Sequence, residues 1–151
     1  MGEKELLVAT YKDGNIIVRE GAESREMYVI QSGNVKVVKC SGNKETELAV
    51  LHEGDLFGEM SLIDVMPRSA TVKAVGETKV LAIDHEAFLK QAREDPTFAF
   101  TVMRDMGRKI RVANALLSTA IEMLKAVQGS ESFLSRTEEL ETELEKLISV
   151  Q

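Results

Sequence analysis

The sequence predicts a mainly β fold with accompanying helices: a β-roll of the jelly-roll type, flanked by helices, with a long C-terminal helix that dimerises. Three observations in its 151 residues support this prediction. Short β-rich runs separated by glycines occupy the chain from Thr10 to Asp84, one helix-compatible segment interrupts them, and a helical repeat follows Asp95. Many short strands without intervening helices favour a sandwich, a jelly roll or a barrel.

Four runs rich in β-branched residues are expected to be strands. Two glycine-containing triplets, Asp13–Asn15 and Ser41–Asn43, have the composition of hairpin turns between them. The expected strands are Tyr28–Ile30, Val35–Lys39, Glu47–Leu51 and Lys79–Ile83.

After Asp84 the pattern becomes helical. Asp84 can cap a short helix that runs through Glu86–Gln91. Asp95 and Pro96 form a strong N-cap and N1 pair for a second helix, which is expected to run to about Gln128.

Apolar residues in this second helix alternate steps of four and three, which makes an unbroken heptad seam. A strict seam indicates a helical partner, and its alanines allow two helices to approach closely. The seam therefore predicts a homodimer through the helix over residues 102–127. The seam residues are Met106, Ile110, Ala113, Leu117, Ala120, Leu124 and Val127.

A last, acidic helix is expected near the C-terminus, where Ser135 and Glu138 form a capping box. Between residues 131 and 151, six Glu stand against one Arg and one Lys, a local balance of −4. We expect a solvated helix face here, with the surface for a downstream protein partner as the alternative.

Composition argues against several classes of function. The net charge of −6 disfavours nucleic acid as a partner of this chain alone. No apolar run approaches the length of a membrane span, so no membrane association is expected. A single Cys40 excludes an internal disulfide and suits a reducing cytoplasm. His52 and His85 are too few for the metal cage of a cupin, so no metal is expected.

The segment most informative about function runs from Phe57 to Val72. It places Gly58 and Glu59 at the start of a short apolar run, and Arg68 follows a turn, between small residues. Free amides at a helix start and one guanidinium form a site for a single phosphate. Glu59 would repel that phosphate unless it had its own donor, and a ribose hydroxyl is the obvious candidate. A phosphate and a ribose side by side indicate a nucleotide.

This segment closely resembles the phosphate-binding cassette of the cyclic nucleotide-binding domain family, and the likeness extends from about Tyr11 to Asn114. The resemblance implies that Arg68 pairs with the phosphate and that Glu59 accepts a hydrogen bond from the ribose 2′-hydroxyl. It further implies that Ser69 adds its backbone amide, with or without its hydroxyl. The cassette residues that the resemblance places at the ligand are Gly58, Glu59, Met60, Ser61, Arg68, Ser69 and Ala70.

On the base side, Val37, Leu48 and Val72 match family positions that form an apolar wall. The chain departs from the family pattern where some members place adjacent Thr and Ser against adenine. It has Ala113 and Asn114 there, so base recognition falls to Asn114 or is weaker.

One further match concerns Lys109, which stands where the family has an arginine that supports the cassette carboxylate. Beyond the long helix the sequence shows no room for a winged helix-turn-helix. DNA binding by this chain alone is therefore not expected.

The expected function is to bind a cyclic mononucleotide, cAMP in preference to cGMP, and to convert occupancy into a change at the long helix. The sequence shows no plausible nucleophile–base pair, so no catalysis is expected. Two alternatives stay open: a structural or interaction module with an unused pocket, and the sensor part of a transcription regulator whose DNA-binding part lies elsewhere. The predicted domains are a cyclic nucleotide-binding β-roll over residues 1–95 with its cassette at 57–72, a dimerisation helix over 96–128, and an acidic helix over 129–151.

Overall fold

A computed structural model describes residues 6–126, 138–139, 142–143 and 146 of the chain. Two compact units divide the chain, Met1–Met103 and Arg104–Gln151. The first unit contains a sheet, two short helices and the beginning of a long helix, and the second unit begins within that long helix.

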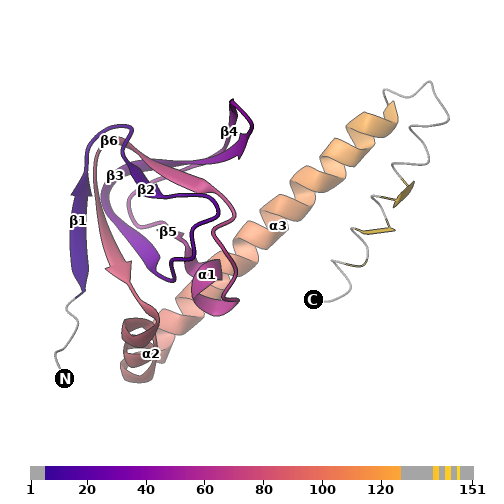
Figure 1. Cartoon of the computed structure of the whole chain (residues 1–151). Coiled ribbons are helices and arrows are strands. Elements are labelled where there is room, and N and C mark those ends of the chain that lie inside the picture. Colours follow the sequence, from indigo (N-terminus) through magenta and orange to yellow (C-terminus); the bar gives the residue numbers. More distant parts are fainter. Residues whose placement is uncertain (1–5, 127–137, 140–141, 144–145, 147–151) are drawn as a thin grey trace. The chain divides into compact units, whose positions relative to one another are not determined.

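The first unit is built on one antiparallel sheet of six strands, which curls into a roll (Figure 1). The strand order is β1-β6-β3-β4, and the short strands β2 and β5 pair with β6 and β3. The long pairing of β3 with β6 is therefore the centre of the roll. The strands are β1 (Leu7–Tyr11), β2 (Ile16–Val18), β3 (Met27–Ser41), β4 (Lys44–Leu51), β5 (Leu56–Phe57) and β6 (Thr71–Ile83).

All four predicted strands lie within observed strands, and two of them, Tyr28–Ile30 and Val35–Lys39, join into β3. The predicted β3–β4 hairpin is present, with Gly42 at φ 58° in its turn. The turn at Asp13–Asn15 also forms, but it closes no hairpin. β1 and β2 each pair with β6 rather than with one another, a long-range pairing that turn composition cannot predict.

Register shifts interrupt the pairing of β3 with β6 near Ile30, Ser32 and Asn34. Such irregularities bend a strand and change which side chains face the core. Gly33 lies in this irregular stretch at φ 82°, and a Cβ there would stand 2.4 Å from the carbonyl oxygen of Glu77. Only glycine fits this crossing of β3 and β6 without displacing the backbone. The buried core cluster consists of Val18, Ile30, Val35, Phe57, Val72 and Val80.

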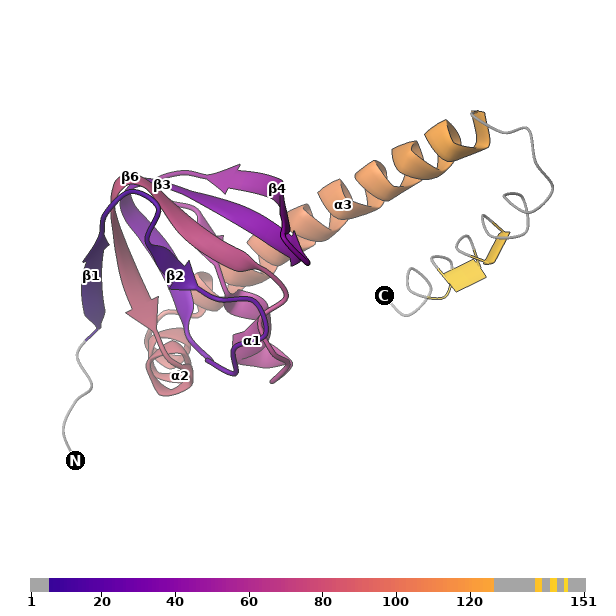
Figure 2. The same cartoon turned by 45° about the horizontal axis from the view of Figure 1, so that its top comes forward.

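Within residues 6–126, the helices are α1 (Glu59–Ile63), α2 (His85–Glu94) and α3 (Pro96–Ala126). Along the chain, α1 lies between β5 and β6, and α2 directly follows β6, at one end of the roll (Figure 2). The single helix-compatible segment predicted within the β region is α1.

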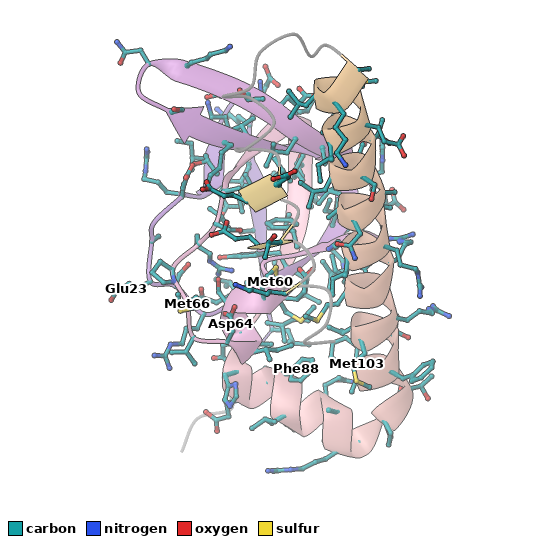
Figure 3. The ribbon with its side chains drawn as sticks, turned by 90° about the vertical axis from the view of Figure 1, so that its right-hand side faces the viewer. Glu23, Met60, Asp64, Met66, Phe88 and Met103 are labelled. Carbon is teal, nitrogen blue, oxygen red and sulfur yellow. The ribbon has the colours of Figure 1, made fainter. Side chains whose placement is uncertain are left out.

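Both predicted caps are present. Asp84 Oδ1 accepts a hydrogen bond from the amide of Ala87 at 2.9 Å, and Asp95 Oδ1 accepts one from the amide of Thr97 at 3.0 Å. Phe88 of α2, labelled in Figure 3, packs its ring against Phe98 at the start of α3, with ring centroids 5.6 Å apart. This aromatic contact joins α2 to the start of α3 within the first unit.

The second unit begins with the part of α3 that carries the seam. Within the described residues, the seam side chains of Ile110, Leu117 and Leu124 are 39%, 44% and 40% exposed. Asp105 forms ion pairs with Arg108 at 2.6 Å and with Lys109 at 2.8 Å.

The end of the long helix, Val127 of the seam and the capping box at Ser135 lie outside the described residues. In the acidic segment, the described residues 138–139, 142–143 and 146 are helical. The predicted domain boundaries at 95 and 128 and the dimer stay predictions. Among the described residues, no helix has both the length and the apolar character needed to cross a membrane.

Candidate functional site

The site begins at the turn from β5 into α1. Gly58 is the N-cap of α1, with φ 77°, a left-handed backbone that L residues with a side chain rarely adopt. A Cβ on Gly58 would lie 2.6 Å from Nη1 of Arg68 and 2.9 Å from the carbonyl oxygen of Glu26. Both the backbone angle and the lack of space therefore require glycine, and the lack of space arises from Arg68 and from the backbone of Glu26.

Arg68 is the central side chain of the site and is only 4% exposed. Its Nε donates to Ser24 Oγ at 2.9 Å, its Nη1 to the carbonyl of Gly58 at 2.8 Å, and its Nη2 to the carbonyl of Glu26 at 2.6 Å. These three bonds fix the plane of the guanidinium. Because a guanidinium has five N–H donors, one donor on each terminal nitrogen is not used by these bonds.

Charge and aromatic contacts also surround this guanidinium. Its Nη2 lies 3.6 Å from Glu26 Oε2, and its Cζ lies 5.8 Å from the centre of the Tyr28 ring, which stacks on Phe57 at 4.9 Å. Burial raises the pKa of Tyr28, Glu26 raises it further, and Arg68 lowers it. The Arg68 guanidinium thus lies beside the Tyr28 ring, which stacks on Phe57, and close to the Glu26 carboxylate.

A hollow of about 430 Å³ lies next to these partners of Arg68. Glu26 and Tyr28 line it together with residues of β1, the end of β6 and Ala87 of α2. None of the residues predicted to contact the ligand lines this hollow, so it is distinct from the predicted site.

α1 carries two buried polar residues. Glu59 is 4% exposed and Ser61 is 5% exposed, whereas Met60 between them is 55% exposed. Figure 3 labels Met60 on α1, together with Asp64 and Met66 in the turn that follows it. A buried carboxylate at the start of α1 and a buried guanidinium nine positions later thus both lie in the predicted cassette, residues 57–72.

The remaining residues predicted to contact the phosphate, Ser69 and Ala70, lie between Arg68 and the start of β6. The amide of Arg68 donates to the carbonyl of Ala22 at 2.9 Å, and the carbonyl of Arg68 accepts from the amide of Gly21 at 2.8 Å. The carbonyl of Ser69 accepts a hydrogen bond from Lys39 Nζ at 2.5 Å. Ser69 is exposed and Ala70 half-buried, so the chain rises toward the surface between Arg68 and the buried start of β6.

The three apolar residues predicted to lie beside the base are more exposed, on the whole, than Arg68 and Glu59. Val72 is 5% exposed, Val37 is half-buried, and the two are directly paired across β6 and β3. Leu48 is 57% exposed and lies opposite the register shift between Val37 and Val38, where β4 carries one extra residue. Asn114 belongs to the second unit, where it is half-buried on α3.

The histidines do not gather into a metal site. His52 is exposed, with Nδ1 3.9 Å from Asp55 Oδ2, and His85 is exposed at the start of α2. Within the described part of the chain, no cluster of three or more His, Cys, Asp or Glu is placed to hold a metal ion.

The cyclic nucleotide-binding domain family matches residues 8–95 of this chain, which run from the second residue of β1 through β6 and include the cassette. The chain belongs to the cyclic nucleotide-binding domain family. The predicted family membership and the predicted β-roll are therefore confirmed.

Individual relatives agree with this assignment. The chain is 36% identical over 105 residues to the cyclic AMP receptor protein of Thermus thermophilus, covering 69% of this chain and 49% of that protein. It is 35% identical over 81 residues to the cAMP-dependent protein kinase regulatory subunit of Blastocladiella emersonii, covering 53% of this chain and 20% of that protein. The crystal structure of the Thermus thermophilus catabolite activator protein superposes with a TM-score of 0.71 at 27% identity, covering 91% of this chain and 79% of that one.

The chain thus spans about half the length of the first of these curated relatives and a fifth of the second. By their names, the first relative is a receptor protein for cyclic AMP and the second is a regulatory subunit of a cAMP-dependent protein kinase.

Sequence reasoning missed the groups that hold Arg68. Ser24 and Glu26 precede β3 and meet Arg68 from more than forty positions away. Neither belongs to a motif with a fixed spacing to the arginine. The sequence offered one signal for these contacts, the glycine before Glu59. A glycine at the start of a helix often marks a place where another group approaches the backbone closely.

Proposed function

We propose that this chain is a cyclic nucleotide sensor that binds cAMP in preference to cGMP and couples occupancy to movement of its C-terminal helices. The observation that carries this proposal is the buried guanidinium of Arg68, which is oriented by three hydrogen bonds. It belongs to a cassette that also contains the buried carboxylate of Glu59, in a chain of the cyclic nucleotide-binding domain family.

Arg68 is proposed to bind the cyclic phosphate through the donors that its protein partners leave unused. A guanidinium already held in one plane loses little conformational freedom when it binds an anion, which favours affinity. Glu59 is proposed to accept from the ribose 2′-hydroxyl, since a carboxylate can accept several hydrogen bonds at once. The backbone amides proposed to face the phosphate are those of Gly58, Met60, Ser61, Ser69 and Ala70.

The base is proposed to lie against Val37, Leu48 and Val72, with Asn114 as its polar partner. An asparagine amide has both donors and an acceptor, so it can meet the edge of adenine or of guanine. Both curated relatives carry cyclic AMP in their names, which supports cAMP as the first ligand to test.

The output is proposed to pass through the segment between Asp84 and Asp95 to the long helix, and through the helix over residues 102–127 to a second copy of the chain. A sensor of this kind requires its ligand to favour one of two states, typically by about 1–3 kcal/mol. The exposure of Ile110, Leu117 and Leu124 supports an apolar face that a partner helix can cover.

Isothermal titration calorimetry with cAMP, cGMP and a cyclic dinucleotide tests the binding proposal. We expect one cyclic mononucleotide bound per chain, with cAMP the tighter ligand. Binding of the dinucleotide alone, or of none of the three, contradicts the proposed ligand class.

A further inference from the structure

The two backbone amides that follow Arg68 are held in orientation through the carbonyls of their own peptides. A trans peptide is planar, and its carbonyl and its N–H point in opposite directions. Fixing the carbonyl of one residue therefore fixes the direction of the N–H of the next. The carbonyl of Arg68 sets the amide of Ser69, and the carbonyl of Ser69 sets the amide of Ala70.

The first of these peptides is held by the backbone alone. The carbonyl of Arg68 accepts from the amide of Gly21 at 2.8 Å, and the amide of Arg68 donates to Ala22 at 2.9 Å. These bonds join backbone groups only, so they do not depend on the side chains of the residues involved.

The second peptide is held by a side chain. The paired register of β3 and β6 ends at Val38 and Thr71, so the Ser69 carbonyl lies beyond the ladder. There it accepts from Lys39 Nζ at 2.5 Å. The ammonium group replaces the strand bond that the sheet no longer provides.

Glu20 holds the lysine in this position. Its Oε1 lies 2.7 Å from Lys39 Nζ, and its Oε2 accepts from the amide of Cys40 at 3.0 Å. The amide of Glu20 donates to Oγ1 of the buried Thr71 at 3.0 Å. Glu20 is therefore tied to the end of β3 and to the start of β6, and from there it forms an ion pair with Lys39.

We infer that Lys39, held by Glu20, is a positioning residue that directs the Ala70 amide toward the proposed phosphate. This inference rests on the proposed function. An ammonium group on the carbonyl also polarises the peptide, which makes the Ala70 N–H a stronger donor. Lys39 acts on the ligand through this peptide and does not touch the ligand itself.

A set of four variants separates this role from a general effect of positive charge. Lys39→Met removes the ammonium group, Lys39→Arg keeps a cationic donor, and Glu20→Gln weakens the hold on the lysine. Lys44→Met is the matched control, because Lys44 is an exposed lysine at the start of β4 on the same hairpin.

We expect Lys39→Met to weaken cAMP binding by roughly three- to tenfold, as for one charged hydrogen bond on an exposed pair. Lys39→Arg should restore most of that loss, and Lys44→Met should leave affinity within about twofold. Glu20→Gln should weaken binding in the same direction as Lys39→Met. Equal losses in Lys39→Met and Lys44→Met, or tighter binding in Glu20→Gln, overturn the inference, because both indicate charge attraction instead of positioning.

A measurement without ligand keeps this inference separate from the proposed function. NMR of the ligand-free protein reports the carbonyl shift of Ser69 and the exchange rate of the Ala70 amide. We expect Lys39→Met to move the carbonyl shift of Ser69 and to change the exchange rate of the Ala70 amide, and Lys44→Met to change neither. If the Ser69 and Ala70 signals are unchanged in Lys39→Met, the inference is wrong, even if cAMP binds. If the signals change but the parent protein does not bind cAMP, only the proposed function is wrong.

Discussion

The phosphate side and the base side of the proposed ligand site are built in different ways. On the phosphate side, Arg68 is buried, bonded to three partners and confined by Gly58, all within one compact unit. On the base side, Leu48 is more than half exposed and Asn114 belongs to the other unit. In the proposed site, the arginine assigned to the phosphate is therefore already held in place by the protein, whereas the residues assigned to the base are less enclosed.

The largest loss of affinity is expected from Arg68→Ala. Removal of the guanidinium leaves a desolvated phosphate without its charged partner, which by analogy with buried charge pairs costs about 2–5 kcal/mol of binding free energy. Arg68→Lys should also bind poorly, because a point charge cannot reproduce the planar fork. Calorimetry with cAMP measures both, and circular dichroism checks the fold. A folded Arg68→Ala variant that binds within threefold of the parent shows that the phosphate assignment is wrong.

The next largest loss is expected from Gly58→Ala, which tests whether the arginine must be held in place. The new Cβ would stand 2.6 Å from Arg68 Nη1 and displace it. Gly14→Ala is the matched control, since Gly14 has φ +76° against +77° for Gly58 and an added Cβ meets nothing within 4 Å.

Both glycine variants should lose roughly 1–2 kcal/mol of stability from the left-handed backbone. Only Gly58→Ala should weaken cAMP binding, by about tenfold or more, because it alone moves a charged hydrogen-bonding group. Thermal unfolding and calorimetry together test this pair. Equal affinities in the two variants would show that the position of Arg68 does not matter.

The ribose contact is expected to contribute somewhat less. If Glu59 accepts from the 2′-hydroxyl, 2′-deoxy-cAMP should bind the parent more weakly than cAMP by about 1.5–3 kcal/mol, the range for hydrogen bonds to charged groups. Glu59→Ala should remove most of that difference, whereas the exposed Glu23→Ala should keep it. Competition titrations measure the ratio, which does not depend on small changes in stability. A parent protein indifferent to the 2′-hydroxyl rules out this role.

On the base side a smaller difference is expected. cAMP should bind more tightly than cGMP by less than about 3 kcal/mol, because few buried polar groups read the base. Asn114→Ala should narrow the gap and weaken the coupling to helix movement while it leaves phosphate binding intact. Distances between spin labels on α3, with and without ligand, measure the coupling. A ligand-driven shift that is unchanged in Asn114→Ala removes this residue from the mechanism.

The smallest effect on affinity is expected from breaking the predicted dimer. Substitution of both Leu117 and Leu124 by Glu places like charges in the seam, and facing like charges disrupt association. This variant should be a monomer that retains the β-roll. Its affinity for cAMP should stay within about threefold of the parent, because the phosphate contacts are unchanged. Sedimentation measures the association state. A parent protein that is monomeric at tens of micromolar, with or without ligand, would show that the seam packs in another way.

The sequence predicted the local parts of this molecule well, because local parts depend on neighbouring residues. The caps at Asp84 and Asp95, the β3–β4 hairpin and the short helix after Gly58 follow from the preferences of a few adjacent residues. The pairing of β2 with β6 could not be predicted, since it joins residues more than fifty positions apart.

The same distinction holds for the site. Arg68 and Glu59 were predicted because they share one cassette with a characteristic order. Ser24 and Glu26, which orient Arg68, and the pair of Lys39 and Glu20 come from separate strands and loops and carry no local pattern. The residues proposed to contact the ligand could therefore be named from the sequence, whereas the groups that orient Arg68 could not.

The most direct test of a prepared phosphate side is the NMR signal of the Arg68 Nε–H group in the protein without ligand. Its bond to Ser24 Oγ at 2.9 Å, in a side chain 4% exposed, predicts one narrow signal that exchanges slowly with water. Addition of cAMP should shift this signal without a large change in its exchange rate, and Arg68→Lys should remove it. A signal that is broad or fast-exchanging before cAMP and becomes protected only afterwards would contradict the account, because the arginine would then be ordered by its ligand.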